Sequence, residues 1–124
     1  MLTADPPDLR SLRVGVVLPA FNESRHVAGV AGALPAWIDS VFVVDDASTD
    51  DTLVVAQRLT DKRVRAIHHD TNTGVGGAMR TGYAAALRDG CDVLESARAA
   101  GSVVARAKQD SEIVKRCAQY GANA

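Results

Sequence analysis

Residues 14–23 have the sequence Val-Gly-Val-Val-Leu-Pro-Ala-Phe-Asn-Glu, and this stretch decides the fold class. The unalternating apolar run over 14–18 is typical of a strand buried on both faces, and a proline ends it. Asn22 is a favoured helix N-cap, and Glu23 falls in a first helical turn, where the helix dipole stabilises an acid. The stretch therefore predicts a strand, a tight loop and a helix that ends at Leu34.

The same pattern of strand, polar loop and helix repeats along the chain. Ser48 and Asp51 have the spacing of a capping box, and the glycines from Gly74 onward introduce an alanine-rich helix. The further elements predicted are strands at 41–44, at 64–68 and from residue 92, and helices at 48–59 and 74–87. Alternation of this kind indicates an α/β fold, a Rossmann-like parallel sheet of about four strands covered on both faces.

Composition bears on the partners, the cellular compartment and the cysteines of the protein. The 124 residues carry a formal net charge of -1 with acids and bases interspersed, so we expect no nucleic acid as partner. Segment 1–12 is polar and lacks the apolar stretch of a secretory signal. We therefore expect a cytoplasmic protein, with Cys91 and Cys117 as reduced thiols rather than a disulfide.

Polar or glycine-rich segments follow three of the predicted strands, at 19–23, 45–50 and 72–78. Ligands of open α/β sheets bind beyond the carboxyl ends of the strands, so these segments predict a site at one edge. Adjacent side chains diverge at a strand end, so one of Asp45 and Asp46 should face the ligand and accept hydrogen bonds from a base or ribose. The alternative is a turn that only caps the next helix.

Glycines at the start of the predicted 74–87 helix have two interpretations. They let the backbone approach a ligand, and the helix N-terminus favours a phosphate. They also suit tight packing of the helix, and Met79 stands where a dinucleotide fingerprint needs its third glycine. His68 and His69 are strand neighbours that point to opposite faces, so no metal site is assigned to them.

Segments 17–23, 43–52 and 74–83 together resemble family 2 glycosyltransferases of the GT-A fold, and among them the polyprenyl-phosphate glycosyltransferases such as dolichol-phosphate mannose synthases. The resemblance covers about 13–94. It implies a nucleotide-diphosphate sugar as donor and a polyprenyl phosphate as one acceptor, which would place the protein at the inner face of the membrane. The site residues that it implies are Pro19, Phe21, Glu23, Val44, Asp46, Gly74 and Gly76, with Asp45 as the more structural acid.

The sequence departs from this family at the metal site. The resemblance implies Mg²⁺ or Mn²⁺ held by an Asp-x-Asp just after the fourth strand. Residues 93–98 offer a single carboxylate there, Glu95. We therefore assign no metal ligand and no catalytic residue.

Residues 95–124 differ in pattern from the rest of the chain. Alanines and valines recur at three- and four-residue spacing from Ala97, which predicts an amphipathic helix that covers the sheet and mediates self-association or a partner contact. The predicted division is a polar segment at 1–12, a nucleotide-sugar-binding half-domain at 13–94 and a divergent helical tail at 95–124. One hypothesis is a truncated enzyme with an unrelated tail.

Three functions are compatible with these patterns. The first is a glycosyltransferase domain that transfers weakly or not at all by itself. The second is a non-catalytic nucleotide-binding or partner-interaction module, distinguished by binding without turnover. The third, a phospho-receiver, would need an acid pair after the first strand, where Pro19 and Ala20 stand.

Overall fold

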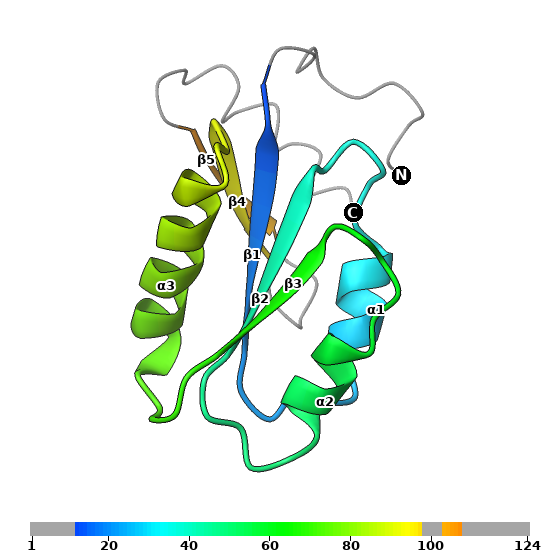
Figure 1. The fold of residues 1–124 in the computed structure, drawn as a ribbon, viewed down its shortest axis with the longest axis vertical. Coiled ribbons are helices and arrows are strands. Elements are labelled where there is room, and N and C mark those ends of the chain that lie inside the picture. Colours follow the sequence, from blue (N-terminus) through cyan, green and yellow to red (C-terminus); the bar gives the residue numbers. More distant parts are fainter. Residues whose placement is uncertain (1–11, 98–102, 108–124) are drawn as a thin grey trace.

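The computed structural model describes residues 12–97 and 103–107, and these fold into a twisted sheet flanked by helices (Figure 1). The elements are β1 Val14–Ala20, α1 Val27–Gly32, β2 Ser40–Asp45, α2 Thr52–Gln57, β3 Val64–His68, α3 Gly74–Arg88, β4 Val93–Ala97 and β5 Val103–Ala107. Strand and helix alternate from β1 to β4, which confirms the predicted α/β class.

The described strands form one sheet in the order β3-β2-β1-β4-β5. Strands β1 to β4 are parallel, with Gly15 opposite Ser40 and Val14 opposite Val93 in the register. Strand β5 runs antiparallel to β4. The strand order reverses at β1, because β2 lies on one side of it and β4 on the other, so β1 marks the switch point at which such sheets bind ligands.

Helices cover both faces of the sheet. Helices α1 and α2 pack on one face, and α3 packs on the other (Figure 1). Val16 and Leu18 belong to the core cluster under α1 and α2, whereas Val17 packs with Val44 and Ala78 under α3. The apolar run of β1 is therefore buried on both sides, as its lack of alternation predicts.

Helix α3 lies very close to β1. A Cβ atom added to Gly82 would stand 2.2 Å from Val17 Cγ1, and one added to Gly15 would stand 2.7 Å from Cys91 Sγ. Cys91 is buried and free, as predicted, and Cys117 lies outside the described residues. Close packing therefore explains Gly82 and Gly15 without a ligand.

The helix limits agree with the sequence for α3 but differ for α1 and α2. Helix α1 begins at Val27, four residues later than an Asn22 N-cap requires. The Glu23 carbonyl accepts hydrogen bonds from the backbone N–H groups of His26 and Val27, which forms a separate turn before the helix. Asn22 does not cap α1, because its side-chain oxygen accepts from Thr49 instead.

The prediction of a helical tail is wrong for the part that the structure describes. Strand β4 continues to Ala97, and residues 103–107 form β5. Val93 pairs with Ala107 and Ala97 with Val103, so β5 satisfies the backbone groups along β4 that would otherwise be unpaired. This ladder is available only in the folded sheet, and it outweighs the weak helical preference of a sequence in which Gly101 and valines interrupt the alanines. The rest of the predicted tail lies outside the described residues.

Candidate functional site at the carboxyl edge of the sheet

Three loops follow the carboxyl ends of β1, β2 and β3, and they lie together at the lower end of the molecule in Figure 1. They comprise residues 21–26, 46–51 and 69–73. All the predicted site residues belong to these loops, to the strand ends before them or to the first turn of α3.

The first and second loops are joined by hydrogen bonds. The backbone N–H of Asn22 donates to Ser48 Oγ at 3.0 Å, and the N–H of Thr49 donates to Asn22 Oδ1 at 2.9 Å. The N–H of Glu23 donates to Thr52 Oγ1 at 2.9 Å, at the start of α2. Polar residues that look like helix caps in the sequence therefore fasten one loop to the other.

Positive φ occurs once in the first loop, once in the second loop and at the first residue of α3. The residues are Asn22 at 53°, Ala47 at 62° and Gly74 at 80°. The left-handed region is unfavourable for alanine, so the surrounding hydrogen bonds must hold Ala47 there. Gly74 adopts it without a steric penalty, which gives one physical reason for a glycine at this position.

Asp46 joins the second loop to the third, and only 3% of its surface is exposed. Its Oδ1 accepts hydrogen bonds from the backbone N–H and the hydroxyl of Thr73, both at 2.9 Å, and its Oδ2 accepts from the N–H of Gly74 at 2.8 Å. His69 Nδ1 lies 2.9 Å from Oδ1. Burial disfavours the charged carboxylate, but these hydrogen bonds outweigh that effect and lower the pKa of Asp46.

Asp45 has different partners from Asp46. Its Oδ1 accepts from the backbone N–H of Ser48 at 3.2 Å, and its Oδ2 lies 2.8 Å from His68 Nδ1. Two acid–histidine pairs thus connect the ends of β2 and β3, one for each face of the sheet. The predicted divergence of Asp45 and Asp46, and of His68 and His69, is confirmed by these contacts.

The most exposed predicted site residues are Phe21, Gly74 and Gly76. Phe21 is 47% exposed, which is unusual for a large aromatic side chain, and Pro19 and Glu23 beside it are partly exposed. A Cβ added to Gly74 or Gly76 would meet no atom within 4 Å, so the space beside both is open. These residues give the edge an accessible surface with an aromatic ring, a carboxylate and bare backbone.

Two predicted residues, Val44 and Asp46, offer almost no surface. Val44 is 0% exposed in the core beneath α3, and Asp46 is occupied by the third loop. Val44 therefore lies in the core next to the candidate site rather than on its surface. A ligand could meet the Asp46 carboxylate only if the contacts of Thr73 and Gly74 opened.

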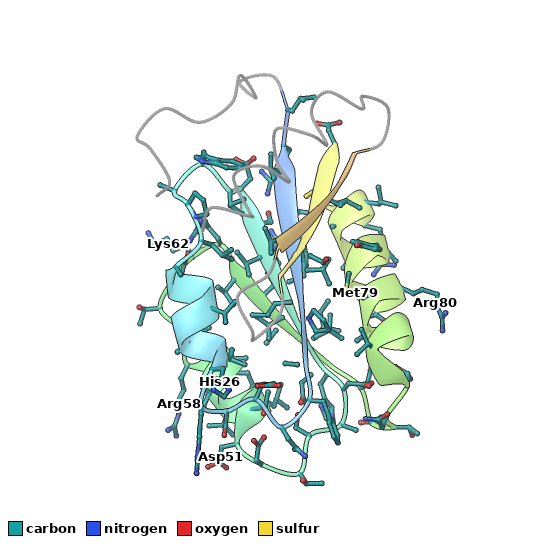
Figure 2. The ribbon with its side chains drawn as sticks, turned by 180° about the vertical axis from the view of Figure 1, so that it is seen from behind. His26, Asp51, Arg58, Lys62, Met79 and Arg80 are labelled. Carbon is teal, nitrogen blue, oxygen red and sulfur yellow. The ribbon has the colours of Figure 1, made fainter. Side chains whose placement is uncertain are left out.

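The backbone N–H of Gly74 donates to Asp46, and the residues of the first turn of α3 that follow it begin beside the open space at Gly76. The first N–H groups of a helix have no partner within the helix, and the dipole makes this end attractive to an anion. Figure 2 shows Arg80, one turn further on, pointing outward from α3, away from the sheet. Arg80 therefore does not face the glycine turn at the start of α3.

A separate hollow lies at the opposite end of α3. Phe42, Arg65, Ile67, Ala85, Arg88 and Asp89 line it. Asp89 is already engaged there by Arg65 at 3.1 Å and by Arg13 at 2.8 Å, and Ser40 donates to it as well. These contacts connect the end of α3 to the sheet. The Asp89 carboxylate is therefore already bonded and is not free to bind a ligand in the hollow.

The described residues do not fit a divalent metal. Within 12–97 and 103–107, no three His, Cys, Asp or Glu side chains are grouped as metal ligands would be. Glu95 stands inside β4, opposite Val16 on one side and Ala105 on the other, rather than in a loop after the strand. A metal that bridges a diphosphate needs acids at the carboxyl edge, whereas the backbone of Glu95 lies two residues before the end of β4.

Sequence reasoning missed His69 and Thr73, which hold Asp46. A signal for the histidine was present, since two acids end one strand and two histidines end the next strand in the chain. Parallel pairing with Asp45 opposite His68 brings these pairs together. Thr73 gave no comparable signal, because its role depends on the path of the loop.

The sequence is similar to those of known glycosyltransferases. Residues 15–94 match the family model described as glycosyl transferase family 2. Polyprenol monophosphomannose synthase of Mycolicibacterium smegmatis is 33% identical over 104 residues, covering 79% of this chain and 39% of that protein. Glycosyltransferase AglD of Haloferax volcanii is 36% identical over 88 residues, covering 63% of this chain and 14% of that protein. The chain thus spans well under half the length of these relatives.

Solved structures show the same fold. Mannosyl-3-phosphoglycerate synthase from Rubrobacter xylanophilus superposes with a TM-score of 0.63 at 24% identity, over 77% of this chain and 35% of that one. A mannosyltransferase from Pyrobaculum calidifontis, solved with GDP-Man and Mn²⁺, gives 0.60 at 24% identity, over 71% of this chain and 27% of that one. At this identity the likeness concerns the fold alone. Among the described residues, no helix has both the length and the apolar character to span a membrane.

Proposed function

Because this chain belongs to glycosyl transferase family 2, we propose that its carboxyl edge binds the nucleotide part of a nucleotide-diphosphate sugar. The observation that carries the proposal is the joining of three loops by hydrogen bonds at the switch point of the sheet, with open space beside two glycines. Such an edge presents rigid backbone and an exposed aromatic ring to one ligand.

The first loop is proposed to receive the base and the ribose. Phe21 is exposed and flat, so a base can stack on it, and Pro19 lies at the strand end beside it. The Glu23 carboxylate, whose Oε2 lies 3.0 Å from His26 Nδ1, can accept a hydrogen bond from a ribose hydroxyl or a base N–H. This division follows the resemblance and the exposure of these side chains.

The start of α3 is proposed to receive the diphosphate. Gly74 and Gly76 leave room for close approach, and the N–H groups of the first turn suit an anion. The second loop then sets the distance between the two subsites. Its Thr49 is bonded to Asn22 of the first loop, and its Asp46 is bonded to Thr73 just before α3.

The reaction proposed for the whole protein is transfer of the sugar to an acceptor such as a polyprenyl phosphate, at the cytoplasmic face of a membrane. The name of the Mycolicibacterium smegmatis relative supports this acceptor class, and the GDP-Man complex of the Pyrobaculum calidifontis enzyme supports the donor class. The family likeness implies Mg²⁺ or Mn²⁺, but the described residues do not fit the ion, so we assign no step to it. We propose that the chain alone transfers weakly or not at all.

Calorimetry with UDP and GDP as probes tests the binding site. We expect one of them to bind, and Phe21→Ala to weaken binding by roughly 1–3 kcal/mol, the scale of base stacking on an aromatic side chain. Val54→Ala is the matched control, because Val54 is 41% exposed on α2 and lies outside the three loops. Equal affinity of Phe21→Ala and wild type would remove Phe21 from the site.

Failure of both nucleotides to bind the wild-type protein would contradict the proposed function. Tight binding without any sugar transfer, together with a stable complex with a partner protein, would instead favour a non-catalytic nucleotide-binding or partner-interaction module. A transfer assay with radiolabelled UDP- and GDP-sugars, with the protein alone and with any such partner, tests this alternative.

A further inference from the structure

His69 begins the third loop and contacts Asp46 and α3, and the proposed nucleotide contacts assign it no role. Its Nδ1 lies 2.9 Å from Asp46 Oδ1, and its Nε2 lies 2.8 Å from Thr81 Oγ1. Its side chain is 15% exposed, against 43% for its neighbour His68. The ring thus bridges the end of β2 and the second turn of α3, with its own backbone at the end of β3.

The chemistry of the partners fixes the tautomer of the neutral ring. An ionised carboxylate only accepts hydrogen bonds, so Nδ1 carries the proton toward Asp46. In the neutral ring Nε2 then has no proton, and the Thr81 hydroxyl donates to it. One hydrogen-bonded chain therefore runs from Thr81 through His69 to Asp46.

Asp46 in turn holds the residues that begin α3. It accepts from the backbone N–H of Thr73 and of Gly74. A change in the direction of the Asp46 carboxylate would therefore move the glycine turn, where Gly74 has positive φ and the space beside it is open. The position of that turn decides where the first N–H groups of α3 point.

We propose that His69 is a positioning residue that aims the Asp46 carboxylate at the glycine turn, and so places the N-terminus of α3 for an anionic ligand. His69 touches no ligand in this arrangement and acts through Asp46. The anionic ligand rests on the proposed nucleotide function, whereas the effect of His69 on the turn does not.

Substitution of His69 by Asn and by Gln separates the contacts of its two ring nitrogens, since Nδ1 faces Asp46 and lies 3.2 Å from Thr73 Oγ1, and Nε2 faces Thr81. The amide nitrogen of Asn occupies a position like that of Nδ1, and the amide nitrogen of Gln a position like that of Nε2. We expect His69→Asn to retain nucleotide affinity within about threefold, and His69→Gln and His69→Ala to weaken it by about tenfold, since only Asn restores the bond to the charged partner. His68→Ala is the control, because it removes a comparable contact, to Asp45 at 2.8 Å.

UDP and GDP are the probes for affinity, and amide hydrogen exchange of Thr73 and Gly74 is the second measurement, which needs no nucleotide. His69→Ala should accelerate exchange at both amides, and His69→Asn and His68→Ala should not. Nitrogen NMR of the neutral wild-type imidazole should show the proton on Nδ1.

The outcomes distinguish this proposal from the nucleotide function. Unchanged exchange at Thr73 and Gly74 in His69→Ala, or a proton on Nε2 in the neutral ring, would overturn the role of His69. Equal losses in the Asn and Gln variants would also overturn it, because the bond to Asp46 would then not be the one that matters. If exchange responds as expected while neither nucleotide binds the wild type, His69 positions the turn and the proposed function is wrong.

Discussion

The close approach of α3 to β1 gives a sharp test of the packing beneath the candidate site. Gly82→Ala adds one methyl group to the face of α3 that lies on β1. The added Cβ would stand 2.2 Å from Val17 Cγ1, 2.9 Å from Cγ2 and 3.1 Å from Cβ, whereas ordinary contact begins at 3.4 Å. Val17 is 0% exposed in the central strand and cannot turn away into solvent.

The helix must therefore move away from the sheet. Overpacking of this kind costs about 1–3 kcal/mol, and the better helix propensity of alanine offsets about 1 kcal/mol of it. The net loss should be about 0–2 kcal/mol, and at roughly 2–8 °C per kcal/mol its upper half lowers Tm by several degrees.

Gly76→Ala is the matched control in the same helix. A Cβ at Gly76 would meet no atom within 4 Å, so only the gain in helix propensity remains. Its free energy of unfolding should rise by about 0.5–1 kcal/mol. Circular dichroism during thermal and urea unfolding measures both variants against wild type.

The difference between the two variants is the decisive quantity. If Gly82→Ala were as stable as Gly76→Ala, helix α3 would not lie against Val17 as described. The position of the α3 N-terminus, and with it the proposed diphosphate subsite, would then be wrong too.

Three further predictions concern charged groups. Asp46→Ala should weaken nucleotide binding by roughly 1.5–3 kcal/mol in calorimetry and should also lower Tm, because Thr73 and Gly74 lose their hydrogen-bond acceptor. Unchanged affinity would exclude Asp46 from any part in the site. Mn²⁺ should change nucleotide affinity by less than about tenfold, because the acids of the described residues do not form a metal site, and a larger effect would point to ligands outside 12–97 and 103–107. Hydrogen bonds from Arg63 lower the pKa of Asp61 from 3.8 to about 2, so this carboxylate stabilises the fold above pH 4 and loses that contribution as the pH falls to 2. Arg63→Ala removes the side-chain hydrogen bonds and should return the pKa of Asp61 toward 3.8 in an NMR titration. A pKa of Asp61 still near 2 in this variant would contradict this cause.

The sequence by itself determined the sheet and its helices because their signals are local. The apolar runs of β1 and β2 are too short for helices and are bounded by Pro19 and Asp45, so no other regular structure competes. The start of α3 could be predicted because Gly74 opens an alanine-rich stretch, and its end because Gly90 is a typical residue just beyond a helix. The structure gives Gly90 the positive φ expected of such a residue. The order of the motifs was enough to predict the family.

The tertiary structure decided what each polar residue does. Asn22 could cap a helix within its own segment, yet its side chain accepts from Thr49, 27 residues further along the chain. Residues 103–107 could continue a helix, yet the free side of β4 made them a strand. In both cases a distant partner offers a hydrogen bond that the local sequence cannot reveal.

Asp46 shows the same limit at the candidate site. The sequence places two acids at the end of β2 and predicts that they diverge, but it cannot say which one is free for a ligand. Folding brings His69, Thr73 and Gly74 to Asp46, and His68 and Ser48 to Asp45. Burial and hydrogen bonding of a carboxylate depend on the loops that surround it, so only the assembled edge determines its role.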